Sequence, residues 1–555
     1  MKRTILVLLL LLFPCVSFSA DVLFWGEPRC AAPLGDDIAV GFPQGMVLMR
    51  PVGDSVVFVD TLFVPGGFDE LFSSGRYLYG VSQYGGVYIF ERGKPLFYAR
   101  CVHIPGIVAS ALDGKRVYIA VGDSVLSLEF GGEGIPRFSL VARTGKKICA
   151  MDVERGKAGF LFDDSTAVLA ALKKPERILF SYSGEVQAIS VYKGKLFFVD
   201  NRGTLFAGKK RGSHPELVRD SVIALGGVFF AHGKTVFSLD RADSIAVSHP
   251  VCSIHPVGKD IIAVFSRGSF SLLRISSGME PIFSYASFGS ATSFSSIADT
   301  LFVLDKSGRI YAISGSSSSF VLDCSCWGHP AEFAAADSFF FSNLGGDNIV
   351  AYNRVRGISS DIHWSGVKHI STFKDMLVIA SYELFFLRIE TRPPYDFRIK
   401  GRFPLVGEPC CVASSGDSFV VADKTGWLYL FLDDSDSVRL IKRLGGYNPA
   451  GSIAAVGGRI FLAERYGRIV VFDGDLSEVT TLPVSGEIVA IAARDKWFAV
   501  AVRDKGILTY RLAGKSNYQV VSSFDWLPGT VNLAIMENCV HILASGSVVR
   551  FHLSD

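Results

Sequence analysis

One short pattern recurs along the chain and constrains its fold more than any other feature. The copy from Leu301 to Ser314 reads LFVLDKSGRIYAIS. In each copy an apolar run ends at Asp, Glu or Ser, a glycine follows three positions later, and a second apolar run begins. An acidic side chain can accept a hydrogen bond from the backbone two residues on, and glycine adopts positive φ readily, so the pattern predicts a β-hairpin. The other copies are LFFVDNRGTLFAGK from Leu196, VVADKTGWLYLFL from Val420, FLAERYGRIVVFD from Phe461 and LYGVSQYGGVYIF from Leu78.

Around each hairpin a longer unit repeats. Most copies follow a run of small residues and a tight Gly or Asp turn, as in CCVASSGD from Cys410. The spacing of the predicted second strands is roughly 39 residues, within the range of propeller repeats. Four short strands per repeat predict a β-propeller blade. The second strands are anchored at Ala39, Leu78, Tyr118, Phe160, Phe197, Phe229, Ile262, Phe302, Phe340, Leu377, Val420, Phe461, Phe498 and His541.

The number of repeats predicts two domains. Propellers typically carry four to eight blades, so fourteen repeats divide evenly into two rings of seven. We therefore expect an all-β chain of tandem propellers with four-stranded antiparallel blades, covering residues 20–287 and 288–555 and meeting near Phe288 to Ser290. The 44 phenylalanines and the 49% of hydrophobic residues can fill the space between blades, while small residues suit strands crowded near an axis.

The N-terminus departs from the β pattern. Lys2 and Arg3 are followed by the apolar run ILVLLLLLF and then by small residues that include Ser17 and Ser19. This order predicts a signal peptide over residues 1–19, and hence a periplasmic or extracellular protein. Two alternatives stay open: a retained anchor helix, and a lipoprotein modified at Cys15.

The end of the chain offers only three strands for its last blade, namely VNLAIMEN from Val531, CVHILAS from Cys539 and SVVRFHLS from Ser547. The segment Val22 to Trp25 is an apolar strand that precedes the first repeat. Because a ring must not leave an open edge, Val22 to Trp25 is predicted to complete the last blade. The alternatives are that this segment pairs within the first ring or that the last blade stays three-stranded.

The hairpin LFVLDKSGRIYAIS resembles the second and third strands of the quinoprotein-like, or PQQ-like, propeller repeat, and more loosely a WD40 blade. The resemblance covers most of the chain as a degenerate strand pattern, and it implies the propeller fold. The Trp-Asp ending of WD40 blades is absent, no Gly-His opening recurs from blade to blade, and the six tryptophans occupy no common repeat position. We therefore expect no quinone or other cofactor.

Several acidic motifs are predicted to be turns rather than sites. The segment DDSDS, Asp433 to Ser437, lacks the glycine and the distant Glu of a calcium loop, so we interpret it as a solvated turn between outer strands. An Asp followed by Ser or Thr precedes many apolar runs, which is typical of an Asx turn that starts a strand. These aspartates are Asp54, Asp123, Asp164, Asp220, Asp243, Asp299, Asp337, Asp417 and Asp436.

Histidines and cysteines give no catalytic pattern. His249 and His255 flank a predicted innermost strand, as do His363 and His369, so a few could approach a central channel. Cys324 and Cys326 form an isolated C-x-C, which is weak evidence for a metal or redox site. The other cysteines in predicted inner strands are interpreted as compact apolar filler. They are Cys30, Cys149, Cys252, Cys410 and Cys411.

These observations favour an exported, non-catalytic propeller that binds a protein or a cell-envelope component through its rim and channel-mouth loops. No catalytic, cofactor-binding or metal-ligating residue is assigned. With a net charge of only +3, no basic face of the kind that nucleic acid requires can be inferred, so no nucleic-acid partner is expected. The chain is expected to be monomeric and not transmembrane after signal cleavage. The alternative is a quinoprotein-like or hydrolase-type propeller enzyme whose site is assembled from several blades.

Overall fold

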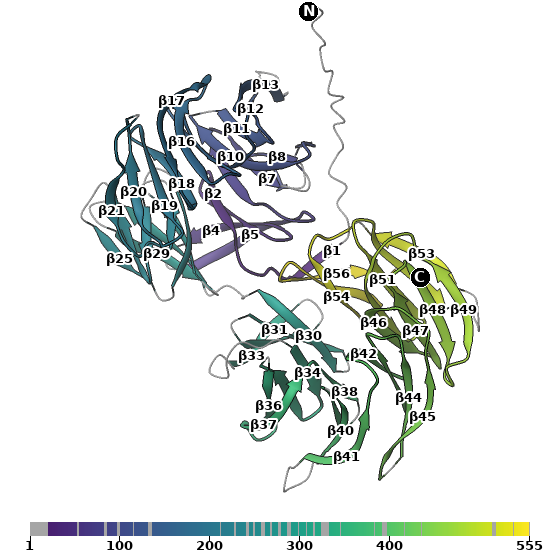
Figure 1. Ribbon diagram of the computed structural model, residues 1–555. Helices are drawn as coiled ribbons and strands as arrows, with labels where there is room; N and C mark the ends of the chain where they lie inside the picture. The colour runs from purple at the N-terminus through teal and green to yellow at the C-terminus, as the bar shows by residue number, and fades with distance from the viewer. Residues whose placement is uncertain are drawn as a thin grey trace, which may run out of the picture. The chain divides into compact units, whose positions relative to one another are not determined.

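A computed structural model describes residues 20–553 with short gaps (Figure 1). The predicted signal peptide, residues 1–19, lies outside the described residues, as do Cys324 and Cys326. The internal gaps are 53–54, 83–85, 97–99, 115, 131–135, 211, 227–228, 240–242, 248–249, 257–260, 267–268, 276–278, 286–289, 298, 307, 315–316, 324–331, 345, 374, 382, 391–396, 416, 435, 513–517, 525 and 537.

The described residues form fourteen four-stranded antiparallel sheets. This confirms the predicted all-β class with propeller-like blades, and each of the fourteen anchors lies in the second strand of its sheet. Among the described residues, no α-helix is long and apolar enough to cross a membrane. Internal contacts divide the chain into unit 1, Glu27–Phe288, and unit 2, which combines Ser19–Gly26 with Gly289–Asp555. The predicted domain boundaries stay a prediction.

Unit 1 contains seven sheets, each built from four consecutive strands. In chain order they are β2 (Cys30–Leu34), β3 (Asp37–Phe42), β4 (Gly45–Val52) and β5 (Ser55–Phe63); β6 (Glu70–Ser74), β7 (Tyr77–Ser82), β8 (Gly86–Glu91) and β9 (Arg100–Val102); β10 (Ile107–Asp113), β11 (Arg116–Val121), β12 (Ser124–Phe130) and β13 (Pro136–Arg143); β14 (Ile148–Glu154), β15 (Lys157–Phe162), β16 (Thr166–Ala171) and β17 (Lys174–Ser183); β18 (Val186–Tyr192), β19 (Lys195–Asp200), β20 (Leu205–Gly208) and β21 (Glu216–Arg219); β22 (Ala224–Gly226), β23 (Phe229–His232), β24 (Thr235–Ser238) and β25 (Ser244–Ala246); β26 (Val251–Pro256), β27 (Ile261–Ser266), β28 (Ser269–Ile275) and β29 (Met279–Tyr285).

Unit 2 also contains seven sheets. They are β30 (Ala291–Ile297), β31 (Thr300–Asp305), β32 (Arg309–Ser314) and β33 (Ser317–Asp323); β34 (Glu332–Ala336), β35 (Phe339–Asn343), β36 (Gly346–Asn353) and β37 (Ile358–Val367); β38 (His369–Phe373), β39 (Met376–Ala380), β40 (Glu383–Ile389) and β41 (Phe397–Pro404); β42 (Pro409–Ser415), β43 (Ser418–Asp423), β44 (Leu428–Asp433) and β45 (Val438–Leu444); β46 (Pro449–Val456), β47 (Arg459–Glu464), β48 (Arg468–Asp473) and β49 (Glu478–Pro483); β50 (Ile488–Arg494), β51 (Trp497–Val502), β52 (Gly506–Leu512) and β53 (Tyr518–Phe524); β54 (Thr530–Met536), β55 (Cys539–Ala544), β56 (Ser547–His552) and β1 (Ala20–Phe24).

The last sheet of unit 2 confirms the predicted closure by the N-terminal strand. β1 pairs antiparallel with β56, so that Ala20 faces Phe551 and Val22 faces Val549. In Figure 1 the purple β1 lies beside the yellow β56. Just past β1, the Ser547 hydroxyl donates a hydrogen bond to the Trp25 carbonyl oxygen at 2.8 Å. The alternatives, pairing within the first ring or a three-stranded last blade, are therefore wrong.

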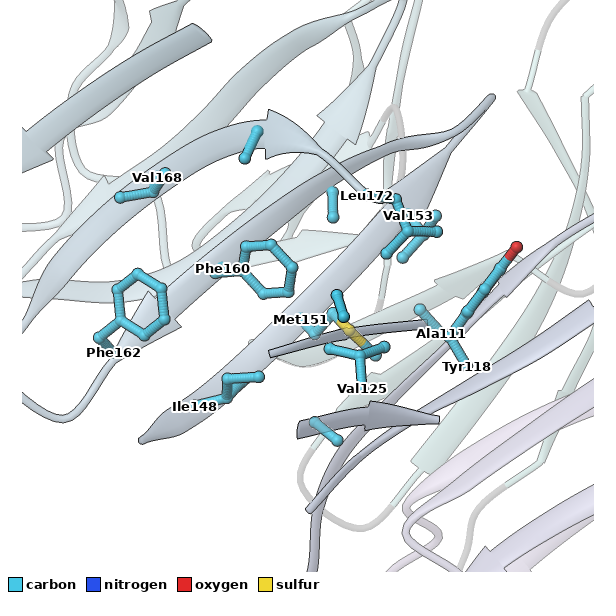
Figure 2. Packing of buried hydrophobic residues seen from close by; sticks show 14 residues of the cluster. Ala111, Tyr118, Val125, Ile148, Met151, Val153, Phe160, Phe162, Val168 and Leu172 are labelled. Carbon is cyan, nitrogen blue, oxygen red and sulfur yellow. The ribbon is translucent and has the colours of Figure 1, made fainter. Parts of the chain in front are cut away.

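The hydrophobic core lies between neighbouring sheets. Figure 2 shows one such cluster, in which Phe160 and Met151 belong to one sheet of unit 1 and Val125 to the preceding sheet. Alternate residues of each strand face opposite sides, so a sheet packed on both faces has long apolar runs. β43, with the sequence SFVVAD, has five consecutive buried residues.

We call the first strand of each sheet its inner strand. In most pairs of neighbouring sheets the two inner strands contact each other. In unit 1 the inner strand β26 of the last sheet contacts β2 of the first. In unit 2 the Ala291 backbone N–H, at the start of β30, donates a 2.8 Å hydrogen bond to the Gly546 carbonyl of the last sheet. These contacts support two seven-bladed rings, which we retain as the interpretation of the fold.

Candidate functional site

The acidic residue of the repeated hairpin caps its turn, as predicted. Asp423 Oδ1 accepts hydrogen bonds from the backbone N–H groups of Thr425 (2.9 Å) and Trp427 (3.0 Å). Its other oxygen accepts bonds from the Tyr429 hydroxyl (2.9 Å) and the Gly407 N–H (2.9 Å). A fully buried carboxylate is stable only with such partners.

These bonds also set the ionisation of the turn. Burial raises the pKa of Asp423, but the hydrogen bonds from Trp427, Thr425, Tyr429 and Gly407 outweigh it and lower the pKa below its usual value. Burial is the main cause that raises the pKa of Tyr429 to about 12. The turn is therefore a structural carboxylate–tyrosine pair.

The turn glycines adopt the predicted left-handed backbone. The φ angles are 77° at Gly203, 89° at Gly308, 94° at Gly426 and 72° at Gly467. The turn at Gly85 lies outside the described residues. This confirms the hairpin assignment at the four described glycines.

The other acidic motifs have mixed outcomes. Asp164 forms the predicted Asx turn, since its Oδ1 accepts the Thr166 N–H at 3.1 Å. Asp299 also lies in a turn, where it pairs with Arg494 at 3.3 Å. Asp54 lies outside the described residues.

The DDSDS segment lies between outer strands as predicted, but its first carboxylate is not solvated. Asp433 forms an ion pair with Lys400 of the preceding sheet, and the two side chains are only 13% and 7% exposed. The turn itself closes with reciprocal backbone hydrogen bonds between Asp434 and Ser437. Burial between two sheets, which a local motif does not encode, explains the difference.

Acidic residues on two inner strands of unit 1 bond to the inner strand of the next sheet. The Ser110 hydroxyl on β10 donates a hydrogen bond to Glu70 Oε2 on β6. Asp152 Oδ2 on β14 accepts bonds from the Ser190 hydroxyl (3.0 Å) and the Val191 N–H (2.7 Å) on β18. Each bond spans about one repeat in sequence.

Burial raises the pKa of both acids. It is the main cause that raises the pKa of Glu70 to about 8, with smaller contributions from the charges of Asp152 and Asp69. Burial also raises the pKa of Asp152, although the hydrogen bonds from Val191 and Ser190 oppose it. Strongly perturbed acids often mark functional sites, but structural networks perturb them too.

Unit 2 has a cavity of about 500 Å³ that is bounded by inner strands of six of its sheets, β30, β38, β42, β46, β50 and β54. We call it the unit 2 cavity. Small side chains make most of its wall, and Ser296, His369, Cys410, Arg494 and Asn532 supply polar groups. It is the candidate binding site of this unit, because it is concave and polar groups from several inner strands converge on it.

A carboxylate–histidine pair lies at this cavity. His369 Nδ1 contacts Glu332 Oε1, and Glu332 Oε2 accepts the Ile370 N–H at 2.7 Å. A carboxylate that orients an imidazole is also found in general-base catalysis. The described residues contain no group of three or more His, Cys, Asp or Glu placed to hold a metal ion.

Of the four histidines expected to flank two inner strands, His369 begins the inner strand β38 and lines the unit 2 cavity. His363 lies on the outer strand β37, where its Nδ1 is 2.6 Å from Asn348 Oδ1, so the predicted inner strand between His363 and His369 is wrong. His249 and the side chain of His255 lie outside the described residues. Sequence order alone did not separate the last strand of one sheet from the first strand of the next.

The cysteine prediction is right for two of the five residues. Cys30 and Cys411 are buried, as expected of apolar filler, and Cys410 is half-buried. Cys149 and Cys252 are exposed. Each of these two, like Cys410, is the extra residue of a β-bulge in its inner strand, and this places its side chain away from the core.

Sequence reasoning missed Glu70, Asp152 and Glu332. Glu70 and Glu332 share one position, the first residue of the inner strands β6 and β34, whereas Asp152 lies within β14. None of the three belongs to the hairpin pattern. The only available signal was an acidic residue inside a strand otherwise rich in small or apolar residues.

Comparisons with known proteins establish the fold only. No family model matches the sequence, and no curated protein matches it. Among solved structures, the chain is similar to PorZ, described as an essential bacterial surface component of the type-IX secretion system of human oral-microbiomic Porphyromonas gingivalis. The TM-score is 0.64 at 11% sequence identity, over 96% of this chain and 87% of that chain.

Proposed function

We propose that the protein is an exported, non-catalytic propeller scaffold that binds a protein or a cell-envelope component through the loops at its rims and channel mouths. The observation that carries this proposal is the fold similarity to PorZ over nearly the whole chain, because PorZ is a surface component of a secretion system. The signal-like N-terminus supports the same location. The chain would act there as a monomer.

The use of polar groups supports a scaffold. The inner-strand acids Glu70, Asp152 and Glu332 bond to the next sheet, which stiffens the circuit of sheets. Rigid frameworks commonly present binding residues on their loops. Tyr466, in the turn between β47 and β48, is 82% exposed, and tyrosine is enriched at interfaces.

Location and binding can be tested together in the native host. We would place a photocrosslinking residue at Tyr466, with a matched control at Val520, which is 57% exposed on the outer strand β53. The proposal expects protein in the cell-envelope or extracellular fraction and a discrete adduct from position 466 but not from 520. Cytoplasmic protein, or equal adducts at both positions, would contradict it.

A second candidate, a hydrolase-type propeller enzyme, is favoured by the Glu332–His369 pair at the unit 2 cavity. In this role His369 would act as a general base toward water, oriented by Glu332. The quinoprotein resemblance adds no cofactor-binding residue to it. Ester hydrolysis that disappears in His369→Gln would favour this candidate, whereas equal turnover in both proteins would reject it.

A further inference from the structure

Two adjacent cysteines face each other at the wall of the unit 2 cavity. Successive side chains of a regular strand point to opposite faces, which keeps neighbouring sulfurs apart. In β42 a bulge interrupts this alternation, because Pro409 pairs with Asp423 and Cys411 with Ala422, leaving Cys410 unpaired. As a result Cys410 Sγ lies 3.7 Å from Cys411 Sγ. Both residues line the cavity, so a small molecule in it can reach the half-buried Cys410.

The surroundings favour reaction at Cys410. This side chain is half-buried, whereas Cys411 is buried. The hydrogen bond with Cys411 is the main cause that lowers the pKa of the Cys410 thiol, and the charges of Lys424 and Arg465 contribute in the same direction. A thiolate is the nucleophile in disulfide exchange, so a lowered pKa favours Cys410 as the attacking group.

We propose that Cys410 and Cys411 form a redox-active vicinal dithiol, which converts reversibly to a disulfide by exchange with a small-molecule disulfide that enters the unit 2 cavity. The Cys410 thiolate attacks one sulfur of the reagent, whose S–S bond breaks and releases one thiol. Cys411 then loses its proton and attacks Cys410 Sγ, releasing the second thiol. The two cysteines lose two electrons and two protons, which the reagent gains as two thiols.

The geometry also makes the product easy to reduce. Neighbouring Cα atoms are about 3.8 Å apart, while disulfides usually join Cα atoms about 4.4–6.8 Å apart. A bond across adjacent residues is therefore strained, and strained disulfides have more oxidising potentials and are the labile ones. The site is thus suited to reversible oxidation rather than to permanent cross-linking.

The chain contains its own matched controls. Cys149 and Cys252 occupy the same bulge position in β14 and β26 and are exposed, but neither has a cysteine neighbour in sequence. They can form mixed disulfides with the reagent but have no adjacent sulfur to resolve them. Cys30 is buried and should stay unreacted as long as unit 1 is folded.

The test treats the full chain with hydroxyethyl disulfide at a series of ratios to mercaptoethanol, blocks the remaining thiols with iodoacetamide, and maps each cysteine by mass spectrometry. We expect the peptide with Cys410 and Cys411 to lose two hydrogens and to carry neither adduct nor label, while Cys149 and Cys252 carry adducts. In Cys411→Ser, the mixed disulfide at Cys410 should rise roughly tenfold, because the resolving thiol is gone.

Two outcomes would overturn the proposal. One is a stable adduct, or an unreacted thiol, at Cys410 in the unmodified chain under conditions that modify Cys149 and Cys252. The other is an equal adduct level at Cys410 with and without Cys411. Cys30 serves as the folding control. If it stays unlabelled in the unmodified chain and in Cys411→Ser, unfolding is not the cause of either result.

Discussion

The two units differ in how they complete their last sheet. Unit 1 ends with β26–β29, four consecutive strands, whereas unit 2 ends with β54–β56 and takes β1 from the other end of the chain. Unit 1 is therefore an insertion between two parts of unit 2 in the sequence. All strands of unit 1 come from one continuous segment, while unit 2 is complete only when residues on both sides of that segment pair.

This difference affects folding more than final stability. The Ser547–Trp25 hydrogen bond joins residues 522 positions apart. The entropy cost of closing a loop grows only with the logarithm of its length. The great length of this loop therefore adds little to the free-energy cost of the contact at equilibrium. Non-local contacts nevertheless form slowly, and so we expect unit 1 to complete its sheets before unit 2.

The hairpin acid shows a second difference between the units. In unit 1, Asp200 is half-buried, and its Oδ1 accepts the N–H groups of Arg202 and Thr204. In unit 2, Asp423 is fully buried and also holds Tyr429 and Gly407. The same sequence pattern can thus be a surface turn in one unit and part of the core in the other.

The largest expected effect comes from removing β1. A chain that begins at Glu27 loses the four residue pairs of β1 with β56 and exposes the edge of β56. If each of the four pairs contributes one backbone hydrogen bond worth roughly 0.5–1.5 kcal/mol, the free energy of unfolding of unit 2 should fall by about 2 to 6 kcal/mol. The truncation removes Trp25, and the five tryptophans that remain all lie in unit 2, so their fluorescence during denaturant unfolding reports this unit alone.

A nicked chain offers an independent check of the same strand. Limited proteolysis is expected first between Phe283 and Thr292, where β29 ends and β30 begins. The fragments should then co-elute in native gel filtration, because β1 on the first fragment pairs with β56 on the second, and should separate in denaturant. Two results would contradict the role of β1 in unit 2. One is that the fragments separate under native conditions, and the other is that unit 2 of the chain from Glu27 is as stable as in the full chain.

The next largest effect concerns the turn glycines. A Cβ at Gly426 would lie 2.1 Å from the Tyr447 carbonyl oxygen, so Gly426→Ala combines left-handed strain with a backbone clash. We expect unit 2 to lose about 2 to 4 kcal/mol by tryptophan fluorescence. Gly458→Ala is the control, since a Cβ there meets nothing within 4 Å and costs about 1 to 2 kcal/mol.

Gly203 extends this test to unit 1. A Cβ at Gly203 would lie 3.0 Å from the Val222 carbonyl oxygen, a milder contact than at Gly426. Gly203→Ala should therefore destabilise unit 1 less than Gly426→Ala destabilises unit 2. Unit 1 is followed as the circular-dichroism transition that tryptophan fluorescence does not report. Equal losses would mean that the two turns are equally embedded.

A smaller expected effect is that the stabilities of the two units depend differently on pH. Glu70, in unit 1, has a pKa raised to about 8, so its contribution is fully present below the unfolded value near 4.5 and is lost as pH rises through 8. His541, in unit 2, has a pKa lowered to about 4, chiefly by burial, so its contribution is present above about 6.5 and is lost as pH falls through 4. The units should respond to pH in opposite directions.

Two substitutions measure this opposition. Between pH 5 and pH 9, unit 1 of the unmodified chain should lose about 1 to 3 kcal/mol more of its free energy of unfolding than unit 1 of Glu70→Gln. Unit 2 of the unmodified chain should lose a similar amount of stability as pH falls from 7 to 4, and His541→Leu should abolish this loss. Denaturant titrations at each pH provide the values. A parallel pH response of both units in the unmodified chain would contradict the assignment.

The repeats explain why the fold could be predicted and much of the site could not. The hairpin from Leu301 to Ser314 is local, so its turn chemistry identifies it without knowledge of its neighbours. The pairing of Val22 to Trp25 followed from counting strands. In contrast, the bond from Glu70 to Ser110 depends on which sheets are neighbours, and the approach of Cys410 to Cys411 depends on a bulge that no residue type marks.

The smallest expected effect concerns the ion pair between Arg494 and Asp299, which joins the sixth sheet of unit 2 to its first. Both side chains are substantially exposed, at 35% and 64%, so water and salt screen the attraction. Arg494→Gln should destabilise unit 2 by about 0.5 kcal/mol or less, and the difference should vanish at high salt. Asp299→Asn should give the same loss, and the double variant should give no more than either single change. A loss comparable to that from removing β1 would instead mean that this surface contact, rather than the borrowed strand, closes unit 2.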